Sequence, residues 1–128
     1  MRDLKSNIDI ASTLRPEART AAGTGTAVNL QGYDSALGEF HAGDWTDGTW
    51  TPKLQESTDG TTFTDVGTDD MQGAFTAVSG TAGENQVQRV GYVGTKQYLR
   101  GFLSGTGTTG MVSSFSIVRG HAARKPLS

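Results

Sequence analysis

The side chains that could do acid–base or ligand chemistry are few and widely separated. His41 and His121 are the only imidazoles, and neither belongs to a His-Glu-x-x-His pattern or a similar helical pair that would hold a metal. The chain contains no cysteine, so thiolate ligands, a cysteine nucleophile and disulfides are excluded together. No Gly-x-Ser-x-Gly elbow nominates a serine nucleophile. We therefore expect no catalytic site and a protein that is not an enzyme.

Acidic and glycine-rich segments suggest ligand binding only at first sight. Calcium needs about six to eight oxygens converging on one point, and no aspartate spacing matches an EF-hand loop. Residues 105–110 fit the Gly-x-Gly-x-x-Gly fingerprint, but we expect a strand after them where a dinucleotide site needs a helix. Turn chemistry therefore explains both patterns, and we expect no metal and no cofactor. The aspartates in question are Asp44, Asp47, Asp59, Asp65, Asp69 and Asp70.

Aromatic residues leave one binding function open. An aromatic platform on a β-sandwich can stack sugar rings, and Tyr33, Trp45, Trp50 and Phe63 are the candidates. Large apolar residues are scarce, so we expect Trp50 and Phe63 inside the core and Trp45 in an exposed turn. A carbohydrate-binding module is therefore an alternative function.

Composition and charge limit the partners. The 128 residues suit one domain, and their formal net charge of −2 provides no broad basic field for nucleic acid or anionic lipid. The start of the chain has no apolar signal region, and no run of about 18 apolar residues occurs. We expect a soluble protein that folds in a cytoplasm and binds neither nucleic acid nor membranes.

The elements expected around these residues are short strands. Abundant glycine and threonine favour strands and tight turns over helices. The clearest signal is a hairpin over residues 54–66, where Asp59-Gly60 suits the turn and Leu54 and Phe63 would share the core face. Pro52 indicates an edge position or a bulge. The pattern predicts an all-β fold, an antiparallel β-sandwich or jelly roll with a barrel as the alternative, and further strands over 27–30, 35–41, 50–56, 75–78, 87–93, 98–103 and 111–118.

The two ends of the chain lack this alternation. We expect an extended N-terminal arm over residues 1–25, a sandwich domain over 26–119 and a short basic C-terminal tail over 120–128. Arms of this kind order when they dock on a partner. The residues expected to contact partners are Arg2, Leu4, Ile8, Ile10, Leu14, Trp45, Arg119, Arg124 and Lys125.

The whole chain resembles a family of small virion proteins of tailed bacteriophages, which are encoded near the major capsid protein. The order and spacing of several short segments carry this resemblance. They are Met1-Arg2-Asp3-Leu4 with Asn7-Ile8, Leu30 to Ala36, Trp45 to Thr49, the hairpin from Leu54 to Val66, Val90 to Lys96, and Val118-Arg119-Gly120-His121.

The resemblance implies a structural role on the virion. Its first form is a capsid decoration or cement protein that binds the outer surface of the capsid lattice. Its partners would be the major capsid protein and further copies of this chain, with a trimer as one candidate oligomer. A tail or head-tail connector component is the alternative within the same class. In each case the protein would be made in the host cytoplasm and end in the virion.

Overall fold

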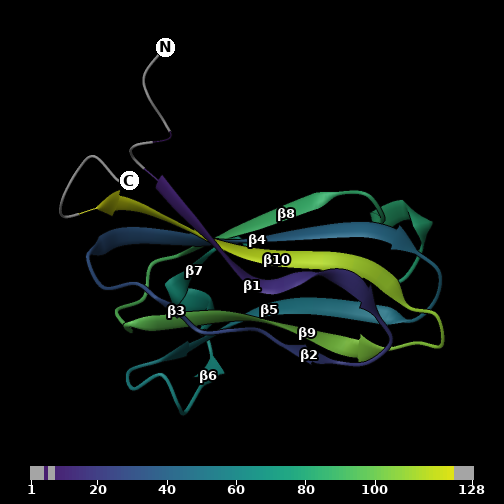
Figure 1. Cartoon of the computed structure of the whole chain (residues 1–128), viewed down its shortest axis with the longest axis horizontal. Coiled ribbons are helices and arrows are strands. Elements are labelled where there is room, and N and C mark those ends of the chain that lie inside the picture. The colour runs from purple at the N-terminus through teal and green to yellow at the C-terminus, as the bar shows by residue number, and fades with distance from the viewer. Residues whose placement is uncertain (1–4, 6–7, 123–128) are drawn as a thin grey trace.

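The computed structural model describes Lys5 and residues 8–122, which form two antiparallel β-sheets packed face to face (Figure 1). The first sheet has the order β1 (Ile8–Arg19), β10 (Met111–Ala122), β4 (Tyr33–Trp45), β8 (Val87–Tyr92) and β7 (Met71–Gln72). The second has the order β2 (Gly23–Thr24), β9 (Tyr98–Thr106), β5 (Thr49–Ser57) and β6 (Thr64–Asp65), and β3 (Val28–Asn29) also pairs with β9. Two short 3₁₀ turns span Thr68–Asp70 and Thr81–Gly83. The predicted all-β sandwich is therefore confirmed, while the jelly-roll topology stays a prediction.

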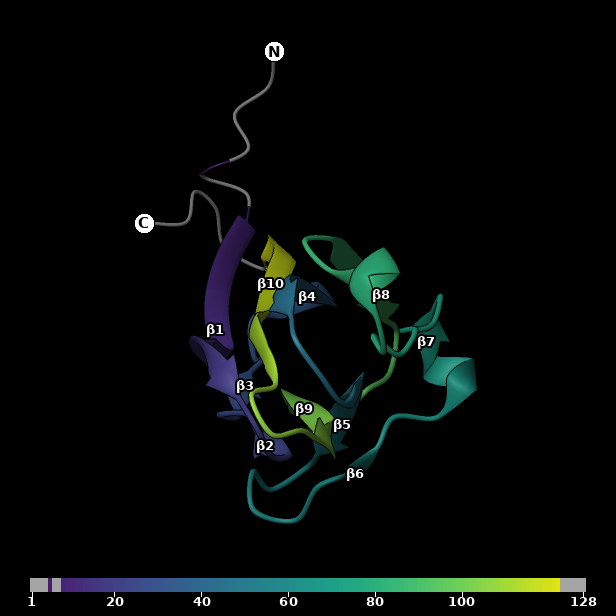
Figure 2. The same ribbon diagram turned by 90° about the vertical axis from the view of Figure 1, so that its right-hand side faces the viewer.

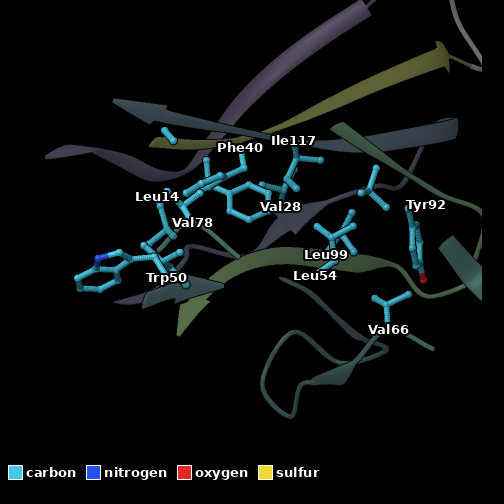
Figure 3. Close-up of a cluster of buried hydrophobic side chains, with 14 of the residues drawn as sticks. Leu14, Val28, Phe40, Trp50, Leu54, Val66, Val78, Tyr92, Leu99 and Ile117 are labelled. Atoms are coloured by element: carbon cyan, nitrogen blue, oxygen red, sulfur yellow. The ribbon is translucent and has the colours of Figure 1, made fainter. Parts of the chain in front are cut away.

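The core lies between the two sheets, as Figure 3 shows. Alternate residues of each strand point inward, so Phe40, Phe115 and Ile117 of the first sheet meet Leu54 and Leu99 of the second. The rings of Phe40 and Phe115 meet edge to face, with 5.7 Å between centroids. These five side chains are at most 1% exposed and belong to one continuous hydrophobic core between the sheets.

The predicted hairpin over residues 54–66 is confirmed in its pairing but not in its packing. Gln55 pairs with Asp65 across β5 and β6. Gly60 supplies the positive φ of 77° that the turn needs. The prediction that Phe63 enters the core is wrong: its ring is half-buried, with the Arg100 guanidinium 4.0 Å from the ring centroid. The reason is that β6 pairs for only two residues, so Phe63 still belongs to the loop.

Pro52 lies in the middle of β5, between β9 and β6, but β6 pairs only with Gln55 and Glu56, so the predicted edge position holds locally at Pro52. Trp50 exchanges backbone hydrogen bonds with Val78 on the outer side of β5, and Val66 N–H donates to Leu54 O on the same side. Alternation therefore directs the Pro52 nitrogen to that side, between these two contacts, where no ladder hydrogen bond is lost.

The three strands predicted nearest the C-terminus are present, and they place Val90 with Tyr92, and Leu99 with Leu103, in the core as expected. The strand predicted over residues 75–78 is wrong apart from one isolated bridge between Trp50 and Val78. Part of this segment is instead held by a side chain, because the Thr76 N–H donates to Gln88 Oε1 at 2.8 Å.

The prediction of an arm over residues 1–25 is wrong from Ile8 onward. Residues 8–19 form β1, which pairs with β10, and residues 23–24 form β2 (Figure 2). Register shifts between Ser12 and Leu14 and between Leu14 and Glu17 break the two-residue period of β1, so the sequence carries no clear strand signal. Pro16 is tolerated because β1 is an edge strand.

The predicted C-terminal tail also begins too early. Strand β10 continues through Ala122, whose backbone pairs with Tyr33 of β4. Residues 120–122 therefore belong to the sandwich. The remaining tail residues, like residues 1–4, 6 and 7 of the arm, lie outside the described residues.

Candidate interaction surface

The start of β1 and the end of β10 lie together at one end of the sandwich. Ile8 pairs with Gly120, which pairs with Ser35 at the start of β4. Figure 1 shows β1 and β10 side by side, with the N-terminal start of β1 and the C-terminal end of β10 at the same end. The segments before Ile8 and after Ala122 are therefore attached next to each other.

An apolar row crosses the outer face of the first sheet close to these attachment points. Ile10 lies opposite Val118, and Val118 lies opposite Leu37, so the three side chains share the face turned away from the core. Ile10 is 59% exposed, and the other two are half-buried. The next row along the sheet is polar, with Ser12, Ser116, Glu39 and Arg89. The apolar row is therefore a local feature of this end of the sheet; we call Ile8, Ile10, Leu37 and Val118 the outer apolar row.

Arg119 is held within the chain and is not part of a loose tail. Its guanidinium pairs with the Asp9 carboxylate, donates to Asn29 O at 2.8 Å and lies 4.7 Å from the centre of the Tyr33 ring. Its side chain is 19% exposed. Burial lowers the pKa of Arg119, although a guanidinium stays charged at any physiological pH. The residue therefore links β10, β1 and β4, and it is an anchor of this end of the sandwich.

A cleft of about 540 Å³ opens beside this anchor. Tyr92 lines the cleft, and its hydroxyl donates to Glu56 Oε1 at 2.7 Å, which joins the two sheets. Burial, and then the hydrogen bond to Glu56, raises the pKa of Tyr92 far above its usual range, so the phenol stays protonated. Polar and apolar surfaces share the lining about equally, and it comes from the start of β4, the end of β8 and the loops near them: Leu30, Gln31, Tyr33–Ala36, Gln72 and Tyr92–Gln97.

Trp45 is not the exposed turn residue that was expected. It ends β4, is half-buried against the core and donates from its indole N–H to Gly48 O at 2.9 Å. Trp50 is fully buried, as predicted, and Tyr33 stacks with Arg119. Phe63 lies under Arg100, so arginines lie over two of the four rings of the expected sugar platform and Trp50 is buried.

Of the other expected partner contacts, the structure moves Leu14 to the core. Its side chain is 4% exposed and lies on β1 opposite Phe115, so the prediction that it contacts a partner is wrong. Ile8 and Ile10 lie on the outer face of β1 as potential contacts. The remaining predicted contacts, Arg2, Leu4, Arg124 and Lys125, lie outside the described residues.

Sequence reasoning missed Leu37 and Val118 as members of this surface. The signal was present in the alternation of strand residues: once Phe115 and Ile117 face inward, Val118 must face outward. Phe40 takes the core position on β4, and Leu37, three residues away, therefore lies on the opposite face.

The acidic turn residues have local hydrogen-bond partners. The Asp47 carboxylate accepts from the backbone N–H groups of Thr108, Thr109 and Gly110, and the bond from Gly110 is the largest cause that lowers its pKa. The segment that matched the dinucleotide fingerprint is thus a turn between β9 and β10, bound by Asp47. Among residues 5 and 8–122, no three His, Cys, Asp or Glu side chains are grouped to hold a metal ion.

Searches for relatives returned no match: no known family model and no curated protein resembles the chain closely enough to be matched. In the part of the chain that the structure describes, no helix has the length and apolarity to cross a bilayer.

Proposed function

We propose that this chain is a structural virion protein of a tailed bacteriophage, a decoration or cement protein that binds the outer surface of the capsid lattice and stabilises it. One observation carries the proposal: the pairing of β1 with β10 brings the start of β1, the end of β10 and the outer apolar row to one end of the sandwich. The sequence resemblance to small virion proteins points to the same role. The protein needs no catalytic group for this function.

The geometry suits docking on a repeating lattice. Ile10, Leu37 and Val118 provide apolar contact area, and the anchor of Arg119 to Asp9 fixes the strands that carry them. A small patch binds weakly by itself, but a lattice offers many identical sites, and linked weak contacts add to high avidity. The partners under this proposal are the major capsid protein and further copies of the chain.

The test is the binding of the purified protein to capsids that lack it. Leu37→Lys should weaken binding, because it places a charge at the β4 end of the outer apolar row, next to Val118. Val87→Lys is the matched control, because Val87 is 56% exposed on the same face of the sheet but pairs with His41, away from this row. Equal binding by the two variants, with the fold of each checked by circular dichroism, would contradict the assigned surface.

Copy number in purified virions separates the two structural roles. Abundance on the scale of the major capsid protein supports decoration, whereas a few copies per particle support the tail or connector alternative. Absence from virions would reject both.

A further inference from the structure

Strand β1 forms one edge of the first sheet, and only half of this edge carries the features that block pairing with another strand. Its second half contains Pro16, two register shifts and the charged residues Arg15, Glu17 and Arg19. Thr26 N–H also donates to Thr13 O at 2.6 Å, which covers the edge at that point. Natural proteins use prolines, bulges and charges of this kind to prevent pairing between edges.

The first half of β1 lacks these features. Residues 8–12 pair with β10 in unbroken register, and Ile10 is the most exposed of the large hydrophobic side chains described. Within the described chain no backbone group pairs with the outer edge of this segment. The unpaired backbone N–H and C=O groups of such an edge can bind a further extended strand.

The hydrogen-bond alternation identifies the residues that face outward. Ala42 N–H donates to Gln86 O at 2.9 Å, so the even-numbered residues of β4 bond toward β8 and the odd-numbered ones toward β10. The even-numbered residues of β10 therefore bond to β4, and its odd-numbered residues bond to Asp9 and Ala11. It follows that Ile8, Ile10 and Ser12 direct their N–H and C=O groups to the open edge.

We propose that this edge pairs antiparallel with the same edge of a second copy of the chain, about a two-fold axis at Ile10. The pairing is self-complementary: Ile8 meets Ser12 of the second copy, Ile10 meets Ile10, and about six backbone hydrogen bonds form. The two first sheets become one continuous sheet. The single charge in the segment, Asp9, lies opposite Ala11 and is already neutralised by Arg119.

A second copy fits this edge better than an unrelated strand for one further reason. Ile10 of each copy lies on the outer face beside Val118 and Leu37, so the pairing joins two outer apolar rows into one stripe across both copies. Five residues on each side bury less than the roughly 800 Å² per partner of a standard interface. The dimer is therefore weak in free solution and favoured where copies are concentrated. This pairing does not depend on the virion role and can be measured without capsids.

Disulfide trapping tests the pairing directly, because the chain contains no other cysteine. Ile10→Cys should form an intermolecular disulfide, since facing residues in a hydrogen-bonded pair have Cα atoms about 5.5 Å apart, within the range that a disulfide spans. Val87→Cys is the control, because Val87 is almost as exposed as Ile10 but lies on β8, away from the edge of β1 that would pair. Cross-linking of Ile10→Cys that is no faster than that of Val87→Cys would overturn the proposal.

Charge substitution tests the two-fold axis. Ile10→Lys and Ile10→Glu should each raise the dissociation constant at least about tenfold in sedimentation equilibrium, because identical charges then face each other. Mixing the two variants should restore dimers, since opposite charges then meet at the axis. Circular dichroism checks the fold of each variant. The pairing would be refuted if the wild-type chain stays monomeric at about millimolar concentration, or if neither charge affects the dimers. If the monomer still binds capsids, the proposed decoration role is unaffected by that result.

Discussion

Replacing Leu14 with alanine tests whether β1 is a strand of the core or a loose arm. Leu14 is 4% exposed on the inner face of β1, opposite Phe115. Three buried carbon groups are lost, at about 0.8 kcal/mol each. The cavity left behind adds up to about 1 or 2 kcal/mol, less if the neighbouring edge collapses into it. We expect the free energy of unfolding to fall by about 2 to 4 kcal/mol, a large part of the stability of a small domain.

The measurement is urea unfolding in dilute solution, followed by the fluorescence of the half-buried Trp45 and the fully buried Trp50. With a slope of about 2 kcal/mol per M, typical of a small domain, the midpoint should fall by about 1 to 2 M. Ile10→Ala is the matched control on the same strand, because its side chain is 59% exposed, and it should cost less than about 1 kcal/mol. If the two variants lose the same stability, Leu14 is not a core residue and the reasoning that placed β1 in the sandwich fails.

Four further outcomes are expected. Deleting residues 1–7 should leave the fold intact by circular dichroism, whereas deleting residues 1–22 should unfold it, because β10 then loses its partner β1. Tyr92→Phe should lower the free energy of unfolding, measured in urea, by about 1 to 3 kcal/mol, because the carboxylate of Glu56, which is only 9% exposed, loses its hydrogen-bond donor. Tyr98→Phe is the control and should lower the free energy of unfolding by less. Gly110→Ala should prevent stable folding, because its new Cβ would lie 1.7 Å from Arg19 O. Gly32→Ala is the control: Gly32 has a similar φ but open space around it, so this change should lower the free energy of unfolding by about 1 kcal/mol, measured by thermal unfolding. The pKa of Asp59 is lowered to about 2, chiefly by the Thr62 backbone N–H, so the Asp59 carboxylate stabilises the fold above its unfolded pKa near 3.8, and this contribution is lost as the pH falls toward 2. Asp59→Asn should therefore flatten the fall in melting temperature over that pH range. An unchanged dependence of melting temperature on pH would count against the turn geometry.

The sequence predicted the centre of the fold well and its margins poorly. Strands β8, β9 and β10 have regular alternation, so their inward residues could be assigned from the pattern alone. The hairpin turn was predictable because Asp59-Gly60 specifies both a side-chain acceptor and a positive φ. These signals are local, so they can be recognised in the sequence without knowing which strand pairs with which.

The errors occurred where a distant partner decides the structure. Strand β1 is irregular in sequence because its bulges follow the shape of β10, and Leu14 becomes a core residue only through its position opposite Phe115. Arg119 was expected to contact another protein, because the residues that it binds within the chain, Asp9 and Asn29, lie far away in sequence. The outer apolar row likewise joins three strands, and no sequence window contains all of them.

The pairing of β1 with β10 also constrains the order in which the protein can fold. Asp9 and Arg119, which lock the two strands together, are 110 residues apart in the chain. During synthesis β1 emerges well before its partner β10, because 110 positions separate Asp9 from Arg119. The first sheet can therefore close only after β10 has been made, and until then the apolar side chains of β1 have no partner strand. Contacts of such long range slow folding and leave the unpaired strand exposed to aggregation in the meantime.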